Sequence, residues 1–164
     1  MRSVPLLVFS VAIASACMPD RQVTQEARAE SPAPRPTAGS VLDAADVVRR
    51  VAPHGKAHVT ELAAGTEAWL GILELAPDVA VPEHRDPTEE TIHVLEGTGT
   101  ITIEGRSWEV GPGDTIFMPK NALVTYKNGP APMRAVQVFA GPGPASKYDA
   151  WEVEAAPPLP TKGE

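Results

Sequence analysis

The 164-residue sequence has a single cysteine, Cys17, and no surplus of positive charge. With one thiol, no disulfide can form within the chain. The formal net charge is -7, and the Lys and Arg residues form no basic stripe on which phosphates could displace counterions. We therefore expect no nucleic-acid partner. The apolar stretch near the N-terminus, residues 4–13, is too short to cross a bilayer.

Turn-forming residues, in contrast, are abundant. Eighteen prolines and thirteen glycines are too many for a helical bundle, and they lack the period of collagen. They suit a chain of many short strands joined by tight turns. A hydrophobic content of 43% over this length is enough for one sizeable core. The composition therefore predicts a single all-β domain.

Residues 1–17, "MRSVPLLVFSVAIASAC", have the pattern of an export signal. Arg2 precedes the apolar stretch, and small residues lead to Cys17. The ending "ASAC" resembles the lipobox of bacterial lipoproteins, which implies that Cys17 is acylated and becomes the first residue of the mature chain. The resemblance predicts an exported, membrane-anchored lipoprotein that faces the periplasm or the cell exterior. The alternative is ordinary signal cleavage nearby.

The rest of the chain divides by composition. Residues 18–40 are polar and Pro-rich and predict a disordered tether. Residues 41–152 form the predicted barrel domain, and residues 153–164 a Pro-rich mobile tail, with Tyr148 and Trp151 packed on the outside before it. Within "VLDAADVVRRVA", residues 41–52, the apolar side chains recur at helical spacing, with Asp43 near the start and two arginines near the end. This predicts a short N-terminal helix.

After Pro53 the hydrophobic period changes from that of a helix to that of a strand. About nine segments of five to nine residues follow, among them "EAWLGILEL", "TIHVLE" and "MRAVQVFA", and turn residues such as "VGPG" and "NGPAP" separate them. No helical segment intervenes and no internal duplication is visible. The pattern predicts one antiparallel sandwich or barrel.

Residues 77–128 resemble the two motifs of the cupin superfamily. The positions that match are His84, Glu90 and Gly97 in the first motif and Gly113, Asp114, Pro119 and Asn128 in the second. Asp86 replaces the second His of the first motif, and Val124 replaces the His of the second. The resemblance implies a single double-stranded β-helix, or jelly-roll, barrel. It also implies a divalent-metal site, because the motif His and Glu residues are metal ligands in cupins.

The alternation of strand residues predicts that the matched side chains meet. His84 and Asp86 are two residues apart on an extended segment and point to one face, and Glu90 shares a face with Ile92 and Val94. One imidazole and two carboxylates would then converge in an apolar interior, where the carboxylates need a cation, a shared proton or water. A His with two carboxylates suits Mn²⁺, Fe²⁺ or Zn²⁺. We therefore predict metal ligation by these three residues.

Two other interpretations remain open. The barrel could bind a small molecule without metal, or it could be purely structural, with the three residues forming salt bridges to Arg85 or Arg106. Tyr126, two residues past Val124, should point into the same pocket as a catalytic proton donor, although a core tyrosine would fit the pattern as well. His93 faces the other way and is not expected to be a ligand.

These observations predict an exported, lipid-anchored cupin-domain protein with a variant divalent-metal site. It would bind or transform a small oxygenated molecule. The alternative is a metal-free ligand-binding or structural cupin without catalysis. A homodimer is expected because cupins often pair through edge strands. The identity of the ligand and the type of reaction stay open.

Overall fold

The computed structural model describes residues 38–43 and 47–154, which belong to one compact unit, Pro34–Glu164. The predicted signal peptide, the lipid site at Cys17, almost all of the tether and most of the C-terminal tail lie outside the described residues. Among the residues described, no helix is long and apolar enough to span a membrane.

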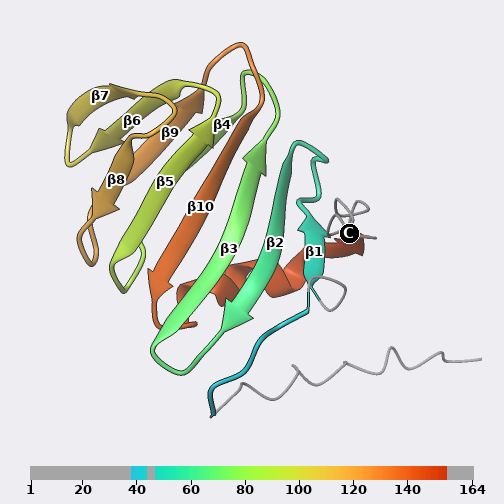
Figure 1. The fold of residues 1–164 in the computed structure, drawn as a ribbon. Helices are drawn as coiled ribbons and strands as arrows, with labels where there is room; N and C mark the ends of the chain where they lie inside the picture. The colour runs from blue at the N-terminus through green and yellow to red at the C-terminus, as the bar shows by residue number, and fades with distance from the viewer. Residues whose placement is uncertain (1–37, 44–46, 155–164) are drawn as a thin grey trace, which may run out of the picture. The chain divides into compact units, whose positions relative to one another are not determined.

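Two antiparallel sheets make up the domain (Figure 1). The seven-stranded sheet has the order β11-β1-β2-β3-β10-β5-β8, and the four-stranded sheet has the order β4-β9-β6-β7. The strands are β1 Val48–Val51, β2 Ala57–Ala64, β3 Ala68–Leu75, β4 Ala80–His84, β5 Glu90–Glu96, β6 Gly99–Ile103, β7 Arg106–Val110, β8 Thr115–Met118, β9 Val124–Asn128, β10 Met133–Ala140 and β11 Glu152–Glu154. The predicted all-β fold is confirmed, and it is the jelly-roll arrangement expected of a cupin.

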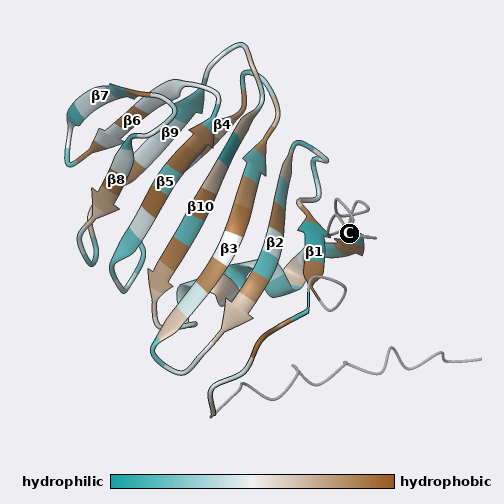
Figure 2. Cartoon of the chain, viewed as in Figure 1, coloured by the Kyte–Doolittle hydropathy of each residue, from teal (hydrophilic) through white to brown (hydrophobic). Residues whose placement is uncertain are grey.

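Strict alternation along the central strands builds the core. In β10, Met133, Ala135, Gln137 and Phe139 are buried, while the residues between them are more exposed. Figure 2 shows this alternation as bands of hydrophobic and hydrophilic residues along β3, β5 and β10. Because side chains of successive strand residues point to opposite faces, each strand contributes one apolar face to the interior of the barrel.

The predicted N-terminal helix is wrong. Val48–Val51 forms strand β1, which pairs with β2 on one side and β11 on the other, and residues 41–43 have no regular structure. Helical spacing of apolar residues in so short a segment is a weak signal, whereas β-branched residues such as Val48 and Val51 favour an extended backbone. Pairing with two neighbours supplies backbone hydrogen bonds that outweigh the helical pattern.

The segment after β10 also differs from the expectation. Pro144–Ala150 forms the 3₁₀ helix η2, and Tyr148 is buried instead of lying outside. The Tyr148 ring lies 5.8 Å from that of Trp69 and 4.8 Å from that of Trp151. These tilted and edge-to-face ring contacts favour burial of an otherwise polar segment. The expected boundary between residues 152 and 153 falls inside β11.

Candidate metal and ligand site

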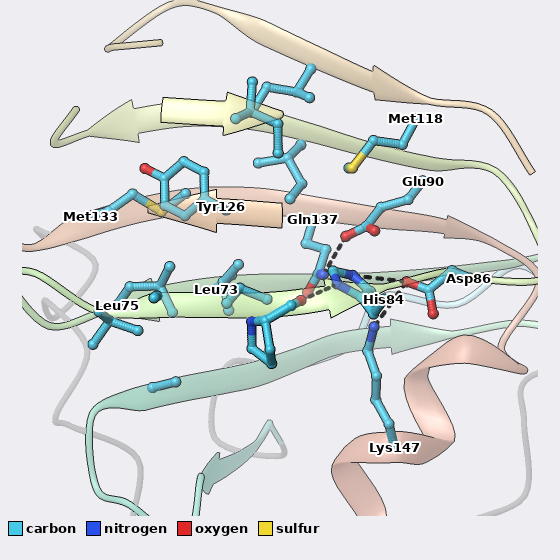
Figure 3. A pocket seen from close by; sticks show the side chains of 18 of the residues that line it. Leu73, Leu75, His84, Asp86, Glu90, Met118, Tyr126, Met133, Gln137 and Lys147 are labelled. Atoms are coloured by element: carbon cyan, nitrogen blue, oxygen red, sulfur yellow. Dashed lines mark hydrogen bonds and ion pairs between the residues drawn. The ribbon is translucent and has the colours of Figure 1, made fainter. Parts of the chain in front are cut away.

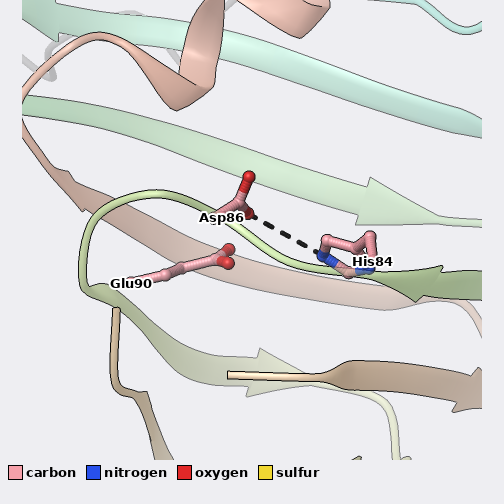
Figure 4. A group of neighbouring side chains, drawn as sticks. All are labelled: His84, Asp86 and Glu90. Carbon is pink, nitrogen blue, oxygen red and sulfur yellow. Dashed lines mark ion pairs between the residues drawn. The ribbon is translucent and has the colours of Figure 1, made fainter. Parts of the chain in front are cut away.

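Three candidate ligands converge where β4 passes into β5 (Figure 4). His84 is the last residue of β4, Glu90 is the first residue of β5, and Asp86 lies in the connecting loop. The backbone N–H of Asn121 donates to the carbonyl oxygen of Asp86 at 2.8 Å, which holds the loop in place. One ligand atom from each residue lies within 4.8 Å of the others. The three side chains therefore meet as predicted, although Asp86 reaches the site from a loop and not from a strand.

The imidazole of His84 is oriented for coordination. Its Nδ1 lies 2.9 Å from the carbonyl oxygen of Pro82. A carbonyl only accepts hydrogen bonds, so Nδ1 carries the proton and the neutral ring leaves Nε2 with a free lone pair. Nε2 is directed toward Asp86, 3.8 Å from its Oδ2. Metal-binding histidines characteristically donate their other ring N–H in this way.

Glu90 is the buried member of the group, with 5% of its surface exposed. Gln137 on β10 donates from Nε2 to Glu90 Oε1 at 2.6 Å, and Tyr148 donates its hydroxyl to Gln137 Oε1 at 3.0 Å. Burial raises the pKa of the Glu90 carboxyl, and the hydrogen bond from Gln137 opposes that shift only in part. The site therefore favours a protonated Glu90 or a cation beside it.

Lys147 on η2 supplies one such cation. Its Nζ lies 3.0 Å from Asp86 Oδ2, and the side chains of Lys147 and Asp86 are 39% and 12% exposed. The sequence pattern had suggested Arg85 or Arg106 for such a pair, but Arg85 lies 3.0 Å from Glu104 instead. Asp86 Oδ2 therefore faces both the ammonium of Lys147 and the imidazole of His84.

A cavity of about 480 Å³ extends from this group into the barrel (Figure 3). Most of its wall is aliphatic or thioether, including Leu73, Leu75, Ile92, Ile101, Met118 and Met133. His84, Asp86, Glu90, Gln137 and Lys147 cluster at one end in the close view. A volume of this size falls in the range of roughly 300–1,000 Å³ that is usual for small-molecule sites. His54, which is exposed, also borders the cavity.

Tyr126 lines the cavity, but its hydroxyl is directed elsewhere. It donates to Asn128 Oδ1 at 3.3 Å. Burial raises the pKa of Tyr126, with a smaller contribution from Glu109, and neither effect involves the candidate ligands. Its role as a catalytic proton donor stays a prediction. The phenol linked to the site is that of Tyr148, whose pKa is raised by burial and then by Glu90.

His93 and Val124 lie outside the group of candidate ligands. His93 is exposed, and its Nδ1 lies 2.9 Å from Thr115 Oγ1, away from the site. Val124 is buried on β9 and stands opposite His84 in the register of β4 and β9. A fourth donor at position 124 would therefore face the three that are present, and the valine leaves that side of the site apolar.

Sequence reasoning missed Gln137, Lys147 and Tyr148. Gln137 carried a detectable signal, because it is the polar residue on the otherwise apolar face of β10. Lys147 and Tyr148 carried none. Asp86 and Lys147 are 61 positions apart in the sequence, and the folding of η2 against the barrel brings them together.

The donor set fits a divalent ion. It combines one neutral imidazole nitrogen with carboxylates from Asp86 and Glu90, each able to offer a ligand atom at the same point. Nitrogen and oxygen donors in this balance suit Mn²⁺, Fe²⁺ or Zn²⁺, and three protein ligands are enough for a site that leaves coordination positions open. All three residues also line the cavity.

The chain is similar to known proteins over the region that contains the site. The cupin domain family matches residues 71–139, which include all three candidate ligands. The dimethylsulfoniopropionate lyase DddW of Ruegeria pomeroyi is 33% identical over 92 residues, which are 53% of this chain and 60% of the lyase. The match thus spans less than two thirds of that enzyme.

Solved structures show the same fold. An RmlC-like cupin from Shewanella frigidimarina superposes with a TM-score of 0.56 at 13% identity, covering 63% of this chain and 92% of that one. The polyketide cyclase RemF from Streptomyces resistomycificus superposes with a TM-score of 0.53 at 25% identity, covering 62% and 79%. Both superpositions cover more than half of the present chain.

Proposed function

We propose, on the basis of the match of residues 71–139 to the cupin domain family, that His84, Asp86 and Glu90 hold a divalent metal ion beside a cavity that binds or transforms a small oxygenated molecule. One observation carries the proposal: the three donors lie within 4.8 Å of one another at the polar end of a largely apolar cavity. A carboxylate pair in such surroundings needs positive charge beside it.

Each residue has a defined part in this proposal. His84 offers Nε2 because Pro82 holds the proton on Nδ1, and Glu90 is oriented by Gln137. The aliphatic walls of the cavity exclude water from a bound molecule. When bound, Mn²⁺, Fe²⁺ or Zn²⁺ would act as a Lewis acid on an oxygen of that molecule.

The similar proteins support a small organic substrate. By their names, one acts on dimethylsulfoniopropionate and the other cyclises polyketides, so related barrels serve as enzymes on oxygen-containing organic molecules. The shared fold does not carry their reactions over to this chain, because cupin sites differ in the residues that line them. The proposal therefore stops at the class of ligand.

A second candidate is a binding protein without metal. The observation that favours it is the ion pair between Lys147 and Asp86, since an internal ammonium already offsets one carboxylate. The hydrogen bond from Gln137 satisfies one oxygen of the other carboxylate, Glu90. In this form the cavity would bind its ligand through shape and hydrogen bonds alone.

Metal stoichiometry separates the two candidates. Full-length protein would be expressed with Mn²⁺, Fe²⁺ or Zn²⁺ supplied, dialysed and subjected to elemental analysis, with thermal unfolding before and after chelation. We expect about one equivalent of metal and a lower midpoint after chelation, because metal that binds only the folded state stabilises it. Metal below about a tenth of an equivalent, with no shift on chelation, would favour the metal-free candidate.

Export, lipid attachment at Cys17 and homodimerisation through edge strands are further parts of the proposal. Mass spectrometry of protein taken from a bacterial membrane fraction would detect an acylated N-terminal Cys17, and Cys17→Ser should release the protein from that fraction. Sedimentation of the soluble domain would report its oligomeric state. A monomer at all accessible concentrations would contradict the dimer.

A further inference from the structure

The two carboxylates of the candidate site and the ammonium of Lys147 lie at one end of the cavity. Aliphatic and thioether side chains from both sheets make up most of the wall, and Tyr126, the phenol at the far end, donates its hydroxyl to Asn128. The charged side chains gather around Asp86 (Figure 3). An occupant that matches this wall has a largely apolar body and a polar head at the charged end, since polar groups placed along the aliphatic side chains would be buried without a partner.

Lys147 is held at the polar end by an oxygen of Asp86 that a metal ion would also need. Lys147 Nζ lies 3.0 Å from Asp86 Oδ2, and His84 Nε2 lies 3.8 Å from the same atom. A metal ion held by His84 and Asp86 would have to use this oxygen or its neighbour on the same carboxylate. Because a divalent ion at bonding distance attracts a carboxylate more strongly than an ammonium does, Asp86 would no longer balance Lys147.

Lys147 would nevertheless stay at the cavity wall. Its Nζ lies 4.8 Å from the centre of the Phe139 ring and 5.5 Å from that of Tyr148, and both rings are buried. Cation–π attraction to these rings holds the ammonium beside the cavity when the carboxylate is taken. η2 is anchored by Tyr148, so Lys147 keeps its place next to the polar end.

Charge balance then selects the head of the ligand. The carboxylates of Asp86 and Glu90 neutralise a divalent ion, and the ammonium of Lys147 is left without a partner. An anionic oxygen is the group that restores neutrality at this end. We therefore propose that the metal-loaded cavity binds an amphipathic organic anion, with an apolar body along the aliphatic wall and its anionic oxygen beside Lys147. This inference rests on the proposed metal site.

The test uses probes that separate head from body. Full-length protein loaded with Mn²⁺ would be titrated calorimetrically with 2-naphthoate, with 2-naphthamide, which has the same body and no charge, and with acetate, which has the head alone. Lys147→Met and Lys147→Gln remove the ammonium, and Lys56→Met removes an exposed lysine outside the cavity lining. Metal content is measured in every sample.

We expect the wild type and Lys56→Met to bind 2-naphthoate about tenfold or more tightly than 2-naphthamide. Acetate should bind far more weakly than 2-naphthoate, because it leaves the apolar wall uncovered. In Lys147→Met and Lys147→Gln the preference for the acid should fall to near unity while the metal content is kept. Those results together would support the inference.

Other outcomes overturn it. Equal affinity for acid and amide in metal-loaded wild type, or no binding of either, would refute the anionic head and leave the metal site standing. A preference kept in both Lys147 variants would assign the anion to the metal and not to Lys147. Protein that takes up no metal would refute the proposed function, and the inference with it, because Asp86 would then keep Lys147.

Discussion

Two groups of polar and charged residues in this barrel contain the same residue chemistry but differ in how their carboxylates are paired with positive charge. The outer cluster lies across β1, β2, β3 and β11 and consists of Arg49, His58, Glu74 and Glu154. The cavity cluster consists of His84, Asp86, Glu90 and Lys147. Each has one imidazole, two carboxylates and one basic side chain. Residue types alone therefore do not distinguish a structural ion-pair network from a candidate metal site.

The difference lies in how the basic side chain reaches the carboxylates. Arg49 pairs with both Glu74 and Glu154, and His58 Nδ1 lies 3.0 Å from Glu154 Oε2. The hydrogen bond from Arg49 lowers the pKa of Glu154, so its charge is stabilised where it is. The outer cluster is thus satisfied by its own members.

In the cavity cluster the ammonium pairs with Asp86 alone. Glu90 is bonded to the neutral Gln137 and is buried, and burial raises its pKa. One carboxylate therefore lacks a full positive partner and is disposed toward an external cation. Among the described residues, only His84, Asp86 and Glu90 meet as a potential metal-binding group. A buried carboxylate without a cationic partner, more than residue composition, therefore distinguishes the candidate functional cluster.

Removing the imidazole from each cluster should produce the largest difference in metal affinity between the two clusters. His84→Ala should weaken Mn²⁺ or Zn²⁺ binding by more than about 100-fold, because it deletes a ligand and not only a supporting group. His58→Ala, the matched change in the outer cluster, should leave the affinity unchanged. Metal titration followed by calorimetry measures both. A similar loss in the two variants would show that the metal binds elsewhere.

Adding a fourth donor to the cavity cluster should raise its metal affinity. Val124→His places an imidazole opposite His84 in the β4–β9 register and should tighten metal binding at least about tenfold by completing a four-ligand set. Thr125→His is the control, because the neighbouring strand residue points to the other face. The two variants are compared by competition with a chelator. Tighter binding by the control would mean that the assigned face is wrong.

Removing the ammonium of Lys147 should also raise the metal affinity, but by less than the added imidazole does. Lys147→Met frees Asp86 from its ion pair and should raise metal affinity about fivefold, the worth of a partly exposed pair. Calorimetric titration of wild type and variant with Mn²⁺ measures the change. Weaker metal binding in the variant would mean that Lys147 supports the site and does not compete for Asp86.

Removing the basic side chain of the outer cluster should lower the stability of the fold and leave metal affinity unchanged. Arg49→Met leaves Glu74 and Glu154 without their common partner and should lower the free energy of unfolding by about 1–2 kcal/mol. It should not alter metal affinity. Urea unfolding with chelator present gives the stability, and the titration above gives the affinity. An unchanged midpoint would show that the network is dispensable.

The pH dependence of stability should have opposite signs in the two clusters. The raised pKa of Glu90 means that the folded state binds its proton more tightly than the unfolded state does. Glu90 therefore lowers stability as pH rises from about 4.3, the unfolded value, through its raised folded pKa. Metal-free Glu90→Gln should gain stability over the wild type across that window.

Glu154 should behave in the reverse manner. Its pKa is lowered, so its contribution is present above about pH 4.3 and is lost as pH falls through the lower folded value. Glu154→Gln should therefore be less stable than the wild type at neutral pH, and the difference should vanish in acid. Urea midpoints between pH 3 and pH 7 would test the pair. The same sign for both variants would refute the contrast.

Local patterns were sufficient for much of the fold and for three of the site residues. Alternation in β5 placed Glu90 with Ile92 and Val94 on the buried face, and the burial of all three agrees. The motif positions from His84 to Asn128 predicted the cupin barrel. Such signals work because a strand repeats every two residues, so a few neighbours reveal which way a side chain points.

The errors arose where local and tertiary preferences compete. Residues 48–51 belong to a segment with helical spacing, yet they form β1 because β2 and β11 offer pairing on both sides. Tyr148 was expected outside and is buried against Trp69. In both cases partners distant in sequence supplied the decisive contacts, and no local pattern contains them.

The order of residues was therefore sufficient to predict the all-β fold and the inward direction of Glu90 on β5, because strand alternation is a short-range property. Which carboxylate is paired with a positive charge depends on contacts that form only in the folded chain. Folding of η2 against the barrel brings Lys147 to Asp86, and β10 brings Gln137 to Glu90. Electrostatic energies depend on separations of a few ångströms and on burial, and these are properties of the folded chain and not of residue order.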